Sequence, residues 1–357
     1  MTTILVTGGA GFIGSNFVHR AASLGMATVV LDALTYAGNR ANLDGLKPGA
    51  KHVFVHGSIN DRPLVARLLD EHRPEAIANF AAESHVDRSI EDPGAFVRTN
   101  IDGTYEMLEA AHAYWRQLDK KAAAAFRFLH VSTDEVYGSI AKGRFNEDSR
   151  YAPNSPYAAS KAASDHLVRA YHRTYGLPAL ITNCGNNYGP RQFPEKLIPH
   201  MVISALEGRN LPIYGDGQHM RDWLYVEDHC AALLRVIERG RPGETYNIGG
   251  EPDRTNLSIV ETLCAVLDKH QPRADGKPYK TQIAFVTDRP GHDRRYALDC
   301  TKLERELGWM PAVSFDRGLD QTIRWYLDNR RWWQDIRSGG YKAERIGLKR
   351  SAAASES

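Results

Sequence analysis

Two side chains at positions 157 and 161 have the types and the spacing of an acid–base pair. Tyr157 and Lys161 lie four residues apart in a stretch with helical periodicity, so they share one helix face and the lysine can hold its charge near the phenol. Such a charge lowers the pKa of a tyrosine, and a tyrosinate near neutral pH could remove a hydroxyl proton while a hydride leaves the same carbon. The spacing alone is common in amphipathic helices. It predicts catalysis here because a dinucleotide-binding pattern precedes it.

A second polar group follows an apolar, strand-like run at residues 126–132. Thr133, Asp134 and Glu135 stand there, which places two adjacent acids at the carboxyl end of a predicted strand, where parallel sheets bind ligands. Such acids often only cap a loop. If they face a sugar already oxidised to a ketone, one acid and one base could remove water across the neighbouring carbon pair. A plain dehydrogenase or an epimerase has no use for that pair.

A glycine-rich turn follows the first predicted strand and opens a helix. Gly8, Gly11 and Gly14 form a G-x-x-G-x-x-G pattern, one residue different from the usual dinucleotide fingerprint. These glycines permit a tight turn and close approach of the backbone to a pyrophosphate, although such a turn can also be purely structural. Asp32, at the end of the second strand, can accept hydrogen bonds from the adenosine ribose and would repel a 2′-phosphate. The pattern therefore predicts NAD rather than NADP.

Strand-like and helix-like runs alternate along the first half of the chain. Apolar or β-branched runs of strand length recur at residues 4–7, 28–31, 53–55, 76–80, 126–132 and 179–182. The longest helical patterns cover residues 94–115 and 155–175. This alternation predicts an α/β fold with a Rossmann-type, doubly wound parallel sheet. After about Cys184 the chain is punctuated by glycine and proline, so we expect a smaller C-terminal α/β lobe.

Length, composition and charge exclude several classes of protein. A chain of 357 residues suggests two domains or one large one, and 42% hydrophobic with 25% charged residues excludes collagen-like, disordered and disulfide-scaffold chains. A formal net charge of +2 favours neither nucleic acid nor an anionic membrane as partner.

The four cysteines form no CxxC pair, which fits a reducing cytoplasm. No apolar run reaches membrane-spanning length, and residues 3–7 leave no room for a signal peptide, so we expect neither secretion nor a membrane span.

Seven segments of the sequence resemble the dTDP-glucose 4,6-dehydratases, a family of the extended short-chain dehydrogenases/reductases. They are TGGAGFIGSNF, AAESHVDRSI, FLHVSTDEVYG, SPYAASKAASDHLV, NNYGPRQFPEKLIP, RDWLYVEDH and DRPGHDRRYALD. The likeness runs from residue 4 to about residue 347. The YxxxK motif is shared across the superfamily, whereas STDEVYG and DRPGHDRRYA are specific to dehydratases of this kind.

The resemblance implies a redox cycle that begins and ends with NAD+. Tyr157, helped by Thr133 and by the charge of Lys161, would deprotonate the glucose 4-hydroxyl as hydride passes from C4 to NAD+. Glu135 would then remove the C5 proton, Asp134 would protonate the departing C6 hydroxyl, and hydride would return to C6. The implied cofactor is NAD, the implied substrate is dTDP-glucose, and the expected product is dTDP-4-keto-6-deoxy-glucose.

The same resemblance assigns residues to the two ligands. The residues expected to bind NAD are Gly8, Gly11, Phe12, Ile13, Gly14, Asp32, Ser58, Ile59, Ala81, Ala82, Thr99, Tyr157, Lys161 and Asn186. Those expected to bind the sugar nucleotide are Ser84, Thr133, Asn187, Lys196, Leu197, Pro212, Tyr214, Arg221, Asn256, Arg289 and His292. The two arginines have independent support, since a diphosphate needs planar cationic donors. Ser58 stands where family members usually carry Asp, which weakens the expected contact to adenine, and Gly185 replaces a more usual Ser.

The resemblance also implies how the chain is organised. Residues 1–184 would form the NAD-binding Rossmann domain, joined by returning segments at about 222–250 and 316–338. Residues 185–350 would form a discontinuous sugar-nucleotide lobe, and 351–357 a disordered tail. In relatives the two longest helices form a four-helix dimer contact, so a homodimer is expected. No metal is expected, since His52 and His56 read as a surface pair on a strand.

Three alternative functions remain open from the sequence. A dehydratase acting on CDP-glucose or GDP-mannose would keep the two acids and differ in the pocket that reads the base. A nucleotide-sugar 4-epimerase would share the glycine-rich loop, Asp32, Tyr157 and Lys161 but would lack Asp134 and Glu135. A non-catalytic NAD-binding regulator on the same fold would usually have lost the tyrosine or the lysine, and both are present.

Overall fold

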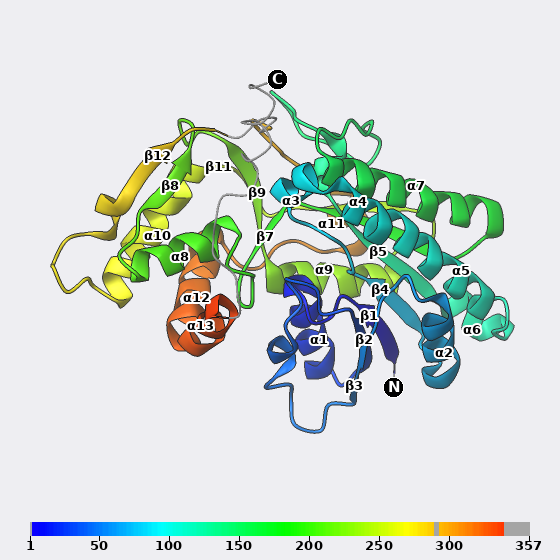
Figure 1. Ribbon diagram of the computed structural model, residues 1–357. Coiled ribbons are helices and arrows are strands. Elements are labelled where there is room, and N and C mark those ends of the chain that lie inside the picture. The colour runs from blue at the N-terminus through cyan, green and yellow to red at the C-terminus, as the bar shows by residue number, and fades with distance from the viewer. Residues whose placement is uncertain (1, 289–292, 339–357) are drawn as a thin grey trace, which may run out of the picture.

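The computed structural model of the chain describes residues 2–288 and 293–338, which form two lobes. Strands β1 to β6 lie in one lobe, and β8 and β12 lie in the other (Figure 1). Arg289 and His292, both expected to contact the substrate, lie outside the described residues, as does the expected tail at 351–357.

A seven-stranded parallel sheet forms the core of the first lobe. Its strands follow the order β10-β6-β5-β4-β1-β2-β3, and every neighbouring pair is parallel. The strands are β1 (Thr3–Thr7), β2 (Ala27–Asp32), β3 (His52–His56), β4 (Ala76–Asn79), β5 (Arg127–Thr133), β6 (Ala179–Cys184) and β10 (Thr245–Ile248). The strand order reverses between β1 and β4, which is where doubly wound sheets bind their ligands. The predicted Rossmann-type architecture is confirmed.

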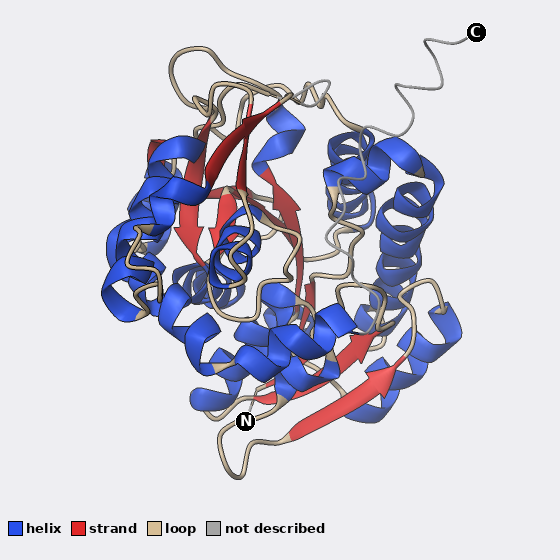
Figure 2. Cartoon of the chain, turned by 60° about the vertical axis from the view of Figure 1, so that its left-hand side comes forward, coloured by secondary structure: helices blue, strands red, loops and turns tan. Residues whose placement is uncertain are grey.

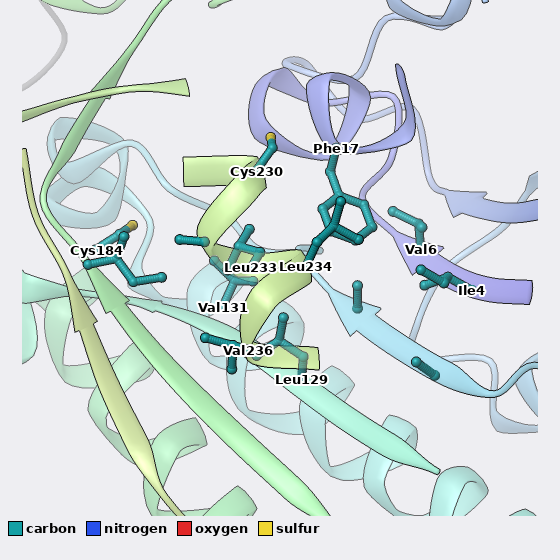
Figure 3. Close-up of a cluster of buried hydrophobic side chains, with 14 of the residues drawn as sticks. Ile4, Val6, Phe17, Leu129, Val131, Cys184, Cys230, Leu233, Leu234 and Val236 are labelled. Atoms are coloured by element: carbon teal, nitrogen blue, oxygen red, sulfur yellow. The ribbon is translucent and has the colours of Figure 1, made fainter. Parts of the chain in front are cut away.

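Helices cover both faces of this sheet (Figure 2). One apolar cluster joins one face to α1 (Phe12–Ser23), α9 (Val226–Arg239) and α11 (Thr301–Leu307). A second cluster joins the other face to α2 (Arg62–His72), α5 (Gly103–Trp115) and α7 (Pro156–Tyr175). In the first cluster, Phe17 of α1 and Leu233 and Leu234 of α9 lie beside side chains of β1 and β5 (Figure 3). Burial of these apolar faces holds the strand ends in place beneath the ligand site.

The second lobe has its own sheets and its own apolar cluster. A three-stranded sheet contains β7 (Asn186–Tyr188), β9 (Met220–Tyr225) and β11 (Glu251–Thr255), and a parallel pair contains β8 (Leu211–Tyr214) and β12 (Ile283–Val286). Its helices are α8 (Leu197–Leu206), α10 (Asn256–His270), α12 (Phe315–Asp328) and α13 (Arg330–Ser338).

Short helical segments occur elsewhere along the chain. They include α3 (Val86–Glu91), α4 (Pro93–Phe96), α6 (Lys120–Ala125), η1 (Arg40–Leu43), η3 (Asp134–Tyr137) and η4 (Tyr279–Gln282).

The two expected returning segments differ in where they pack. From 222–250, α9 and β10 join the first lobe, whereas β9 pairs with β7 and β11. The segment 316–338 forms α12 and α13, and these pack with α8 and α10 in the apolar cluster of the second lobe. The apolar stripe of α12 faces that cluster, which is why this segment does not return to the large sheet within the described ranges. Trp332 still reaches the first lobe, donating a hydrogen bond to Asn42 Oδ1 at 2.8 Å.

The expected helix at 94–115 contains a widened turn. Residues Val97–Asp102 form a π-helical segment, η2, between α4 and α5. Within it Asn100 is buried, and its side-chain amide accepts a hydrogen bond from Glu83 N at 2.9 Å and donates to Glu83 O at 3.0 Å and to Ser160 Oγ at 2.8 Å. Such widened turns occur frequently at functional sites. This one ties the loop after β4 to α7.

Candidate active site

A cavity of about 340 Å³ opens at the carboxyl ends of β1, β2, β4, β5 and β6. All the residues expected to bind NAD or to act in catalysis line it, and so do four of the residues expected to bind the substrate. They are Gly8, Gly11, Phe12, Ile13, Gly14, Asp32, Ser58, Ile59, Ala81, Ala82, Ser84, Thr99, Thr133, Asp134, Glu135, Tyr157, Lys161, Asn186, Asn187 and Lys196. One cavity therefore brings together the glycine-rich loop, the tyrosine–lysine pair and the two acids.

The glycine-rich loop leaves no room for side chains. Gly8 has φ +66°, and a Cβ there would lie 2.7 Å from Ala81 N. A Cβ on Gly14 would lie 2.2 Å from Gly8 O, so α1 packs directly on the turn. Gly11, which precedes the first residue of α1, also lines the cavity. Bare backbone at a helix N-terminus is what a pyrophosphate requires, so these residues fit a dinucleotide.

Asp32 is held at the end of β2 by two backbone donors. Its Oδ2 accepts a hydrogen bond from Ala10 N at 2.8 Å, and its Oδ1 accepts one from Leu34 N at 2.8 Å. Burial raises the pKa of Asp32, and the two backbone N–H groups oppose that change. Each carboxylate oxygen keeps a lone pair for a ribose hydroxyl, and the charge disfavours a 2′-phosphate. The environment of Asp32 therefore fits NAD.

Ser58 is already engaged within its own loop. Its hydroxyl donates to Asn60 Oδ1 at 3.2 Å and accepts from Asn60 N at 3.1 Å, and Asn60 in turn donates to Arg98 O at 2.8 Å. The serine therefore stiffens the loop between β3 and α2. It also lines the cavity.

Tyr157 and Lys161 lie at the start of α7, beside the end of β5. Ser155 caps this helix by accepting a hydrogen bond from Ala158 N at 3.1 Å. Lys161 is 3% exposed, and its Nζ donates to Val131 O at 2.9 Å. In the chain alone the pKa of Tyr157 lies well above its usual value, because burial and then the charge of Glu135 raise it. This direction is opposite to the one expected from the YxxxK spacing, and burial is the largest of its causes.

A buried polar network supports Lys161. His130 Nε2 lies 3.3 Å from Lys161 Nζ and 3.5 Å from Asp165 Oδ1. Asp165 Oδ2 accepts hydrogen bonds from Ser132 Oγ at 2.8 Å and from Tyr151 OH at 3.0 Å. Burial raises the pKa of Asp165 to about 7, and the charge of Lys161 opposes that change. Burial likewise lowers the pKa of Lys161, and Asp165 raises it. The carboxylate therefore favours the charged amine.

The two acids differ in their surroundings although they are adjacent. Thr133 is the N-cap of η3: its Oγ1 accepts a hydrogen bond from Glu135 N at 3.3 Å and donates one to Asp134 Oδ1 at 3.3 Å. Asp134 is 2% exposed, and burial followed by the charges of Glu135 and Asp222 raises its pKa well above the usual value. Glu135 is half-buried. A buried carboxyl with a raised pKa and a more accessible carboxyl therefore stand side by side, an arrangement that suits a general acid beside a general base.

Known proteins match this chain over nearly its whole length. A family model described as GDP-mannose 4,6 dehydratase matches residues 5–322. The dTDP-glucose 4,6-dehydratase of Xanthomonas campestris pv. campestris (strain B100) is 61% identical over 348 residues, which are 97% of this chain and 99% of that protein. The dTDP-glucose 4,6-dehydratase 1 of Escherichia coli (strain K12) is 52% identical and covers 95% of this chain and 97% of its own length.

A solved structure agrees with these sequence matches. DesIV from Streptomyces venezuelae, a dTDP-glucose 4,6-dehydratase crystallised with NAD and TYD bound, superposes with a TM-score of 0.85 at 48% identity, covering 94% of this chain and 100% of its own. The chain belongs to the dTDP-glucose 4,6-dehydratase family.

In this member of the dehydratase family, the residues expected to bind the substrate divide into two groups. Ser84, Asn187 and Lys196 line the cavity, and Lys196 Nζ donates to Ser84 O at 3.0 Å. Five others are not among the described residues that line it. They are Leu197, Pro212, Tyr214, Arg221 and Asn256.

Among that second group, Arg221 is the most firmly held. Its guanidinium donates to Met220 O at 2.8 Å and to Asp293 O at 2.9 Å, and it lies 4.6 Å from the ring centre of Tyr296. These contacts tie Arg221 to Asp293 and Tyr296, which belong to the described segment that begins at residue 293. Whether it contacts a diphosphate stays a prediction.

Glu195 is a cavity residue of this dehydratase that the sequence did not reveal. Its side chain is 4% exposed, its Oε1 accepts a hydrogen bond from Tyr36 OH at 3.1 Å, and its Oε2 lies 3.5 Å from His85 Nε2. Glu195 thus joins the loop after β2 to the segment that carries Lys196. The only available signal was its position beside that lysine in a motif shared with the family.

Other expectations concern metals, thiols and membranes. Within residues 2–288 and 293–338, no three His, Cys, Asp or Glu side chains come together as metal ligands, and His52 instead pairs with Thr28 Oγ1 at 3.0 Å. The four cysteines, all in the described ranges, carry free thiols. None of the helices in those ranges combines the length and the apolar character needed to cross a bilayer.

The role of Asp165 can be tested on the lysine itself. The negative charge of Asp165 favours the charged form of Lys161, so Asp165→Asn should lower the pKa of Lys161 by about one pH unit or more. The measurement is an NMR titration of [13Cε]lysine-labelled protein, with the resonance assigned by Lys161→Met. Ser132→Ala is the control, since it removes one hydrogen bond to the carboxylate and keeps its charge. An unchanged Lys161 titration in the asparagine variant would show that Asp165 does not set this charge.

Proposed function

We propose that the protein is a dTDP-glucose 4,6-dehydratase, which converts dTDP-glucose to dTDP-4-keto-6-deoxy-glucose with NAD as cofactor. The observation that carries this proposal is the meeting of Asp134 and Glu135 with Tyr157 and Lys161 around one cavity beside the glycine-rich loop. Relatives that share 50–61% of the sequence over nearly the whole chain bear the same name. Of the alternatives, an epimerase has no use for the two acids, and the relatives reported above are not named for CDP-glucose or GDP-mannose.

The first step is removal of a proton from the C4 hydroxyl. Tyr157 accepts that proton, and Thr133, which lines the same cavity, helps to orient the hydroxyl. Lys161 supplies the positive charge that favours the tyrosinate. The glycine-rich loop, Asp32 and the other lining residues named above would hold NAD+, which would supply the hydride acceptor at C4 and the hydride donor at C6.

The second step is loss of water across C5 and C6. A ketone at C4 acidifies the C5 proton, and Glu135, the more exposed acid, removes it and later returns it to C5. Asp134, whose pKa is raised by burial, donates a proton to the C6 hydroxyl as it leaves. Ser84, Asn187 and Lys196 contact the sugar nucleotide from the cavity wall. Further contacts come from Leu197, Pro212, Tyr214, Arg221, Asn256, Arg289 and His292.

The chain works as a homodimer in the cytoplasm, with residues 1–184 binding NAD and 185–350 reading the nucleotide. Apolar side chains remain exposed on the helices that pair in relatives: Val97 of η2 is 46% exposed, Tyr105 of α5 is 40% and Tyr175 of α7 is 51%. A second copy would bury them. The free cysteines fit a reducing compartment.

Mass spectrometry of the product tests the reaction. With dTDP-glucose deuterated at C4, we expect loss of one water and retention of the deuterium, because the hydride is carried from C4 to C6. A product of unchanged mass with inverted C4 would indicate an epimerase. No reaction with this substrate, alongside dehydration of a CDP or GDP sugar, would contradict the thymidine assignment.

Substitution of the acids tests the elimination step. Asp134→Asn and Glu135→Gln should each lower the rate of dehydration by about 10²- to 10⁴-fold, the usual contribution of a general acid or base. Exchange of C5 hydrogen with deuterated solvent should be lost in Glu135→Gln. Asp148→Asn, at an exposed acid near η3 in sequence, is the matched control and should keep wild-type activity. Near-normal dehydration in either active-site variant would contradict its role.

Sedimentation tests the association. At working concentration we expect a species of twice the 39.9 kDa chain mass. Tyr175→Glu should weaken the dimer, because it places a charge on the exposed helix face. Leu24→Glu is the control, since Leu24 is 58% exposed at the end of α1, outside those helices. A wild-type protein that sediments as a monomer would contradict the dimer.

A further inference from the structure

A row of buried polar side chains crosses the parallel sheet beneath the active site. Strand pairing sets Thr7 of β1, Asn79 of β4 and His130 of β5 side by side. They are 0%, 1% and 1% exposed, respectively. Polar groups removed from water are costly unless they are hydrogen-bonded, so each should have a partner. The proposed reaction uses none of the three directly.

The distances along this row show which atoms carry protons. Thr7 Oγ1 accepts a hydrogen bond from Ala81 N at 3.3 Å and donates one to Asn79 Oδ1 at 2.6 Å. A separation of 2.6 Å is ordinary between two oxygens and short for a nitrogen donor, so the oxygen of the Asn79 amide faces Thr7. Its Nδ2 then faces His130 Nδ1, 3.1 Å away. An amide nitrogen can only donate, so Nδ1 accepts.

His130 therefore carries its single ring proton on Nε2. Burial and then the charge of Lys161 lower the pKa of His130 well below its usual value, so the ring is neutral and has one N–H. Nε2 lies 3.3 Å from Lys161 Nζ and 3.5 Å from Asp165 Oδ1. A protonated nitrogen cannot accept a hydrogen bond from the lysine. The group that this N–H can stabilise is the carboxylate.

The carboxylate of Asp165 has one oxygen to spare for this N–H. Its Oδ2 accepts from Ser132 and Tyr151, whereas Oδ1 makes no hydrogen bond within the described ranges. Because 3.5 Å is long for a hydrogen bond, the Nε2–H group acts mainly as a dipole whose positive end lies near Oδ1. The other titratable groups that interact with Asp165 are Lys161, Tyr137 and Tyr151. Burial raises the pKa of both tyrosines, so Lys161 is the charged one.

We propose that His130 is a positioning residue whose Nε2–H group favours the ionised form of Asp165. Thr7 and Asn79 fix that tautomer, and the ionised carboxylate in turn favours the charge of Lys161. The inference rests on the proposed function, in which that charge assists the tyrosine. With the proton on Nδ1 instead, the Nε2 lone pair would face the carboxylate and disfavour its charge. The two tautomers therefore predict opposite effects of His130 on the pKa of Asp165.

The tautomer can be read directly in the wild-type protein. The full chain, labelled with [15N]histidine and loaded with NAD, is studied by long-range proton–nitrogen NMR. The ring of His130 is assigned by its nuclear Overhauser contact with the Lys161 side chain, so no variant is needed. We expect the nitrogen shift of a protonated atom at Nε2 and of an unprotonated atom at Nδ1. The reverse pattern would overturn the proposal.

The effect on the carboxylate is measured by NMR titration of [13Cγ]aspartate-labelled protein, with Asp165 assigned by Asp165→Asn. His130→Leu removes the N–H group and should raise the pKa of Asp165 by about one pH unit or more. His130→Gln keeps an N–H donor and should restore most of the wild-type value. His52→Leu, on the edge strand β3, is the matched control and should change nothing. An Asp165 pKa that falls or stays constant in His130→Leu would contradict the proposal.

The pH profile of dehydration separates this role from simple packing. Burial places the pKa of Asp165 at about 7, so a rise of one pH unit lowers its ionised fraction at pH 7 from about one half to about one tenth. Activity of His130→Leu at pH 7 should fall about fivefold and recover as the pH rises. An equal loss at every pH would overturn the proposal. A wild-type enzyme that forms no dehydrated product would overturn the proposed function, while the two NMR measurements would still decide the role of His130.

Discussion

A positive charge buried beneath a tyrosine is the constraint on which the rest of the site depends. An ammonium group that leaves water is destabilised unless it is hydrogen-bonded and paired. Lys161 is stabilised from two elements: the end of β5 supplies Val131 O and His130, and α7 supplies the charge of Asp165, one turn beyond the lysine, which contacts His130. The register of α7 against β5 is therefore fixed. The same register sets Tyr157 near Thr133. Thr133 is the last residue of β5, and η3 follows it.

The part of this arrangement that follows from local pattern was predictable. Carboxyl ends of neighbouring parallel strands meet at one edge of a sheet, so the turn after β1, Asp32 at the end of β2 and Thr133 at the end of β5 had to come together. The i, i+4 spacing placed Tyr157 and Lys161 on one helix face. Asp165 continues that face four residues further on, and the spacing offered a signal for it. The sequence offered no such signal for His130. Its role appears only when the pairing of β1, β4 and β5 aligns Thr7, Asn79 and His130 in one row.

The second lobe was less predictable because its contacts are made between segments far apart in the chain. Arg221 is oriented by carbonyls about 70 residues away, and Glu195 by Tyr36 on the other side of the cavity. No local periodicity encodes such pairs. The segment 316–338 gave the same difficulty: its amphipathic stripe predicts that one face is buried without saying against what. In the structure the partners are α8 and α10, whose apolar faces complete the cluster of that lobe.

The tyrosine pKa shows how burial and function oppose each other in this site. In the chain alone, burial raises the pKa of Tyr157 and of Asp134 in the same direction. A raised pKa suits Asp134 as the proton donor and hinders Tyr157 as the base. A positive charge placed nearer to Tyr157 than to Asp134 would lower the pKa of the tyrosine more than that of the aspartic acid, because Coulomb attraction falls with distance. Such a charge would separate the pKa values of the base and the acid, as acid–base catalysis requires.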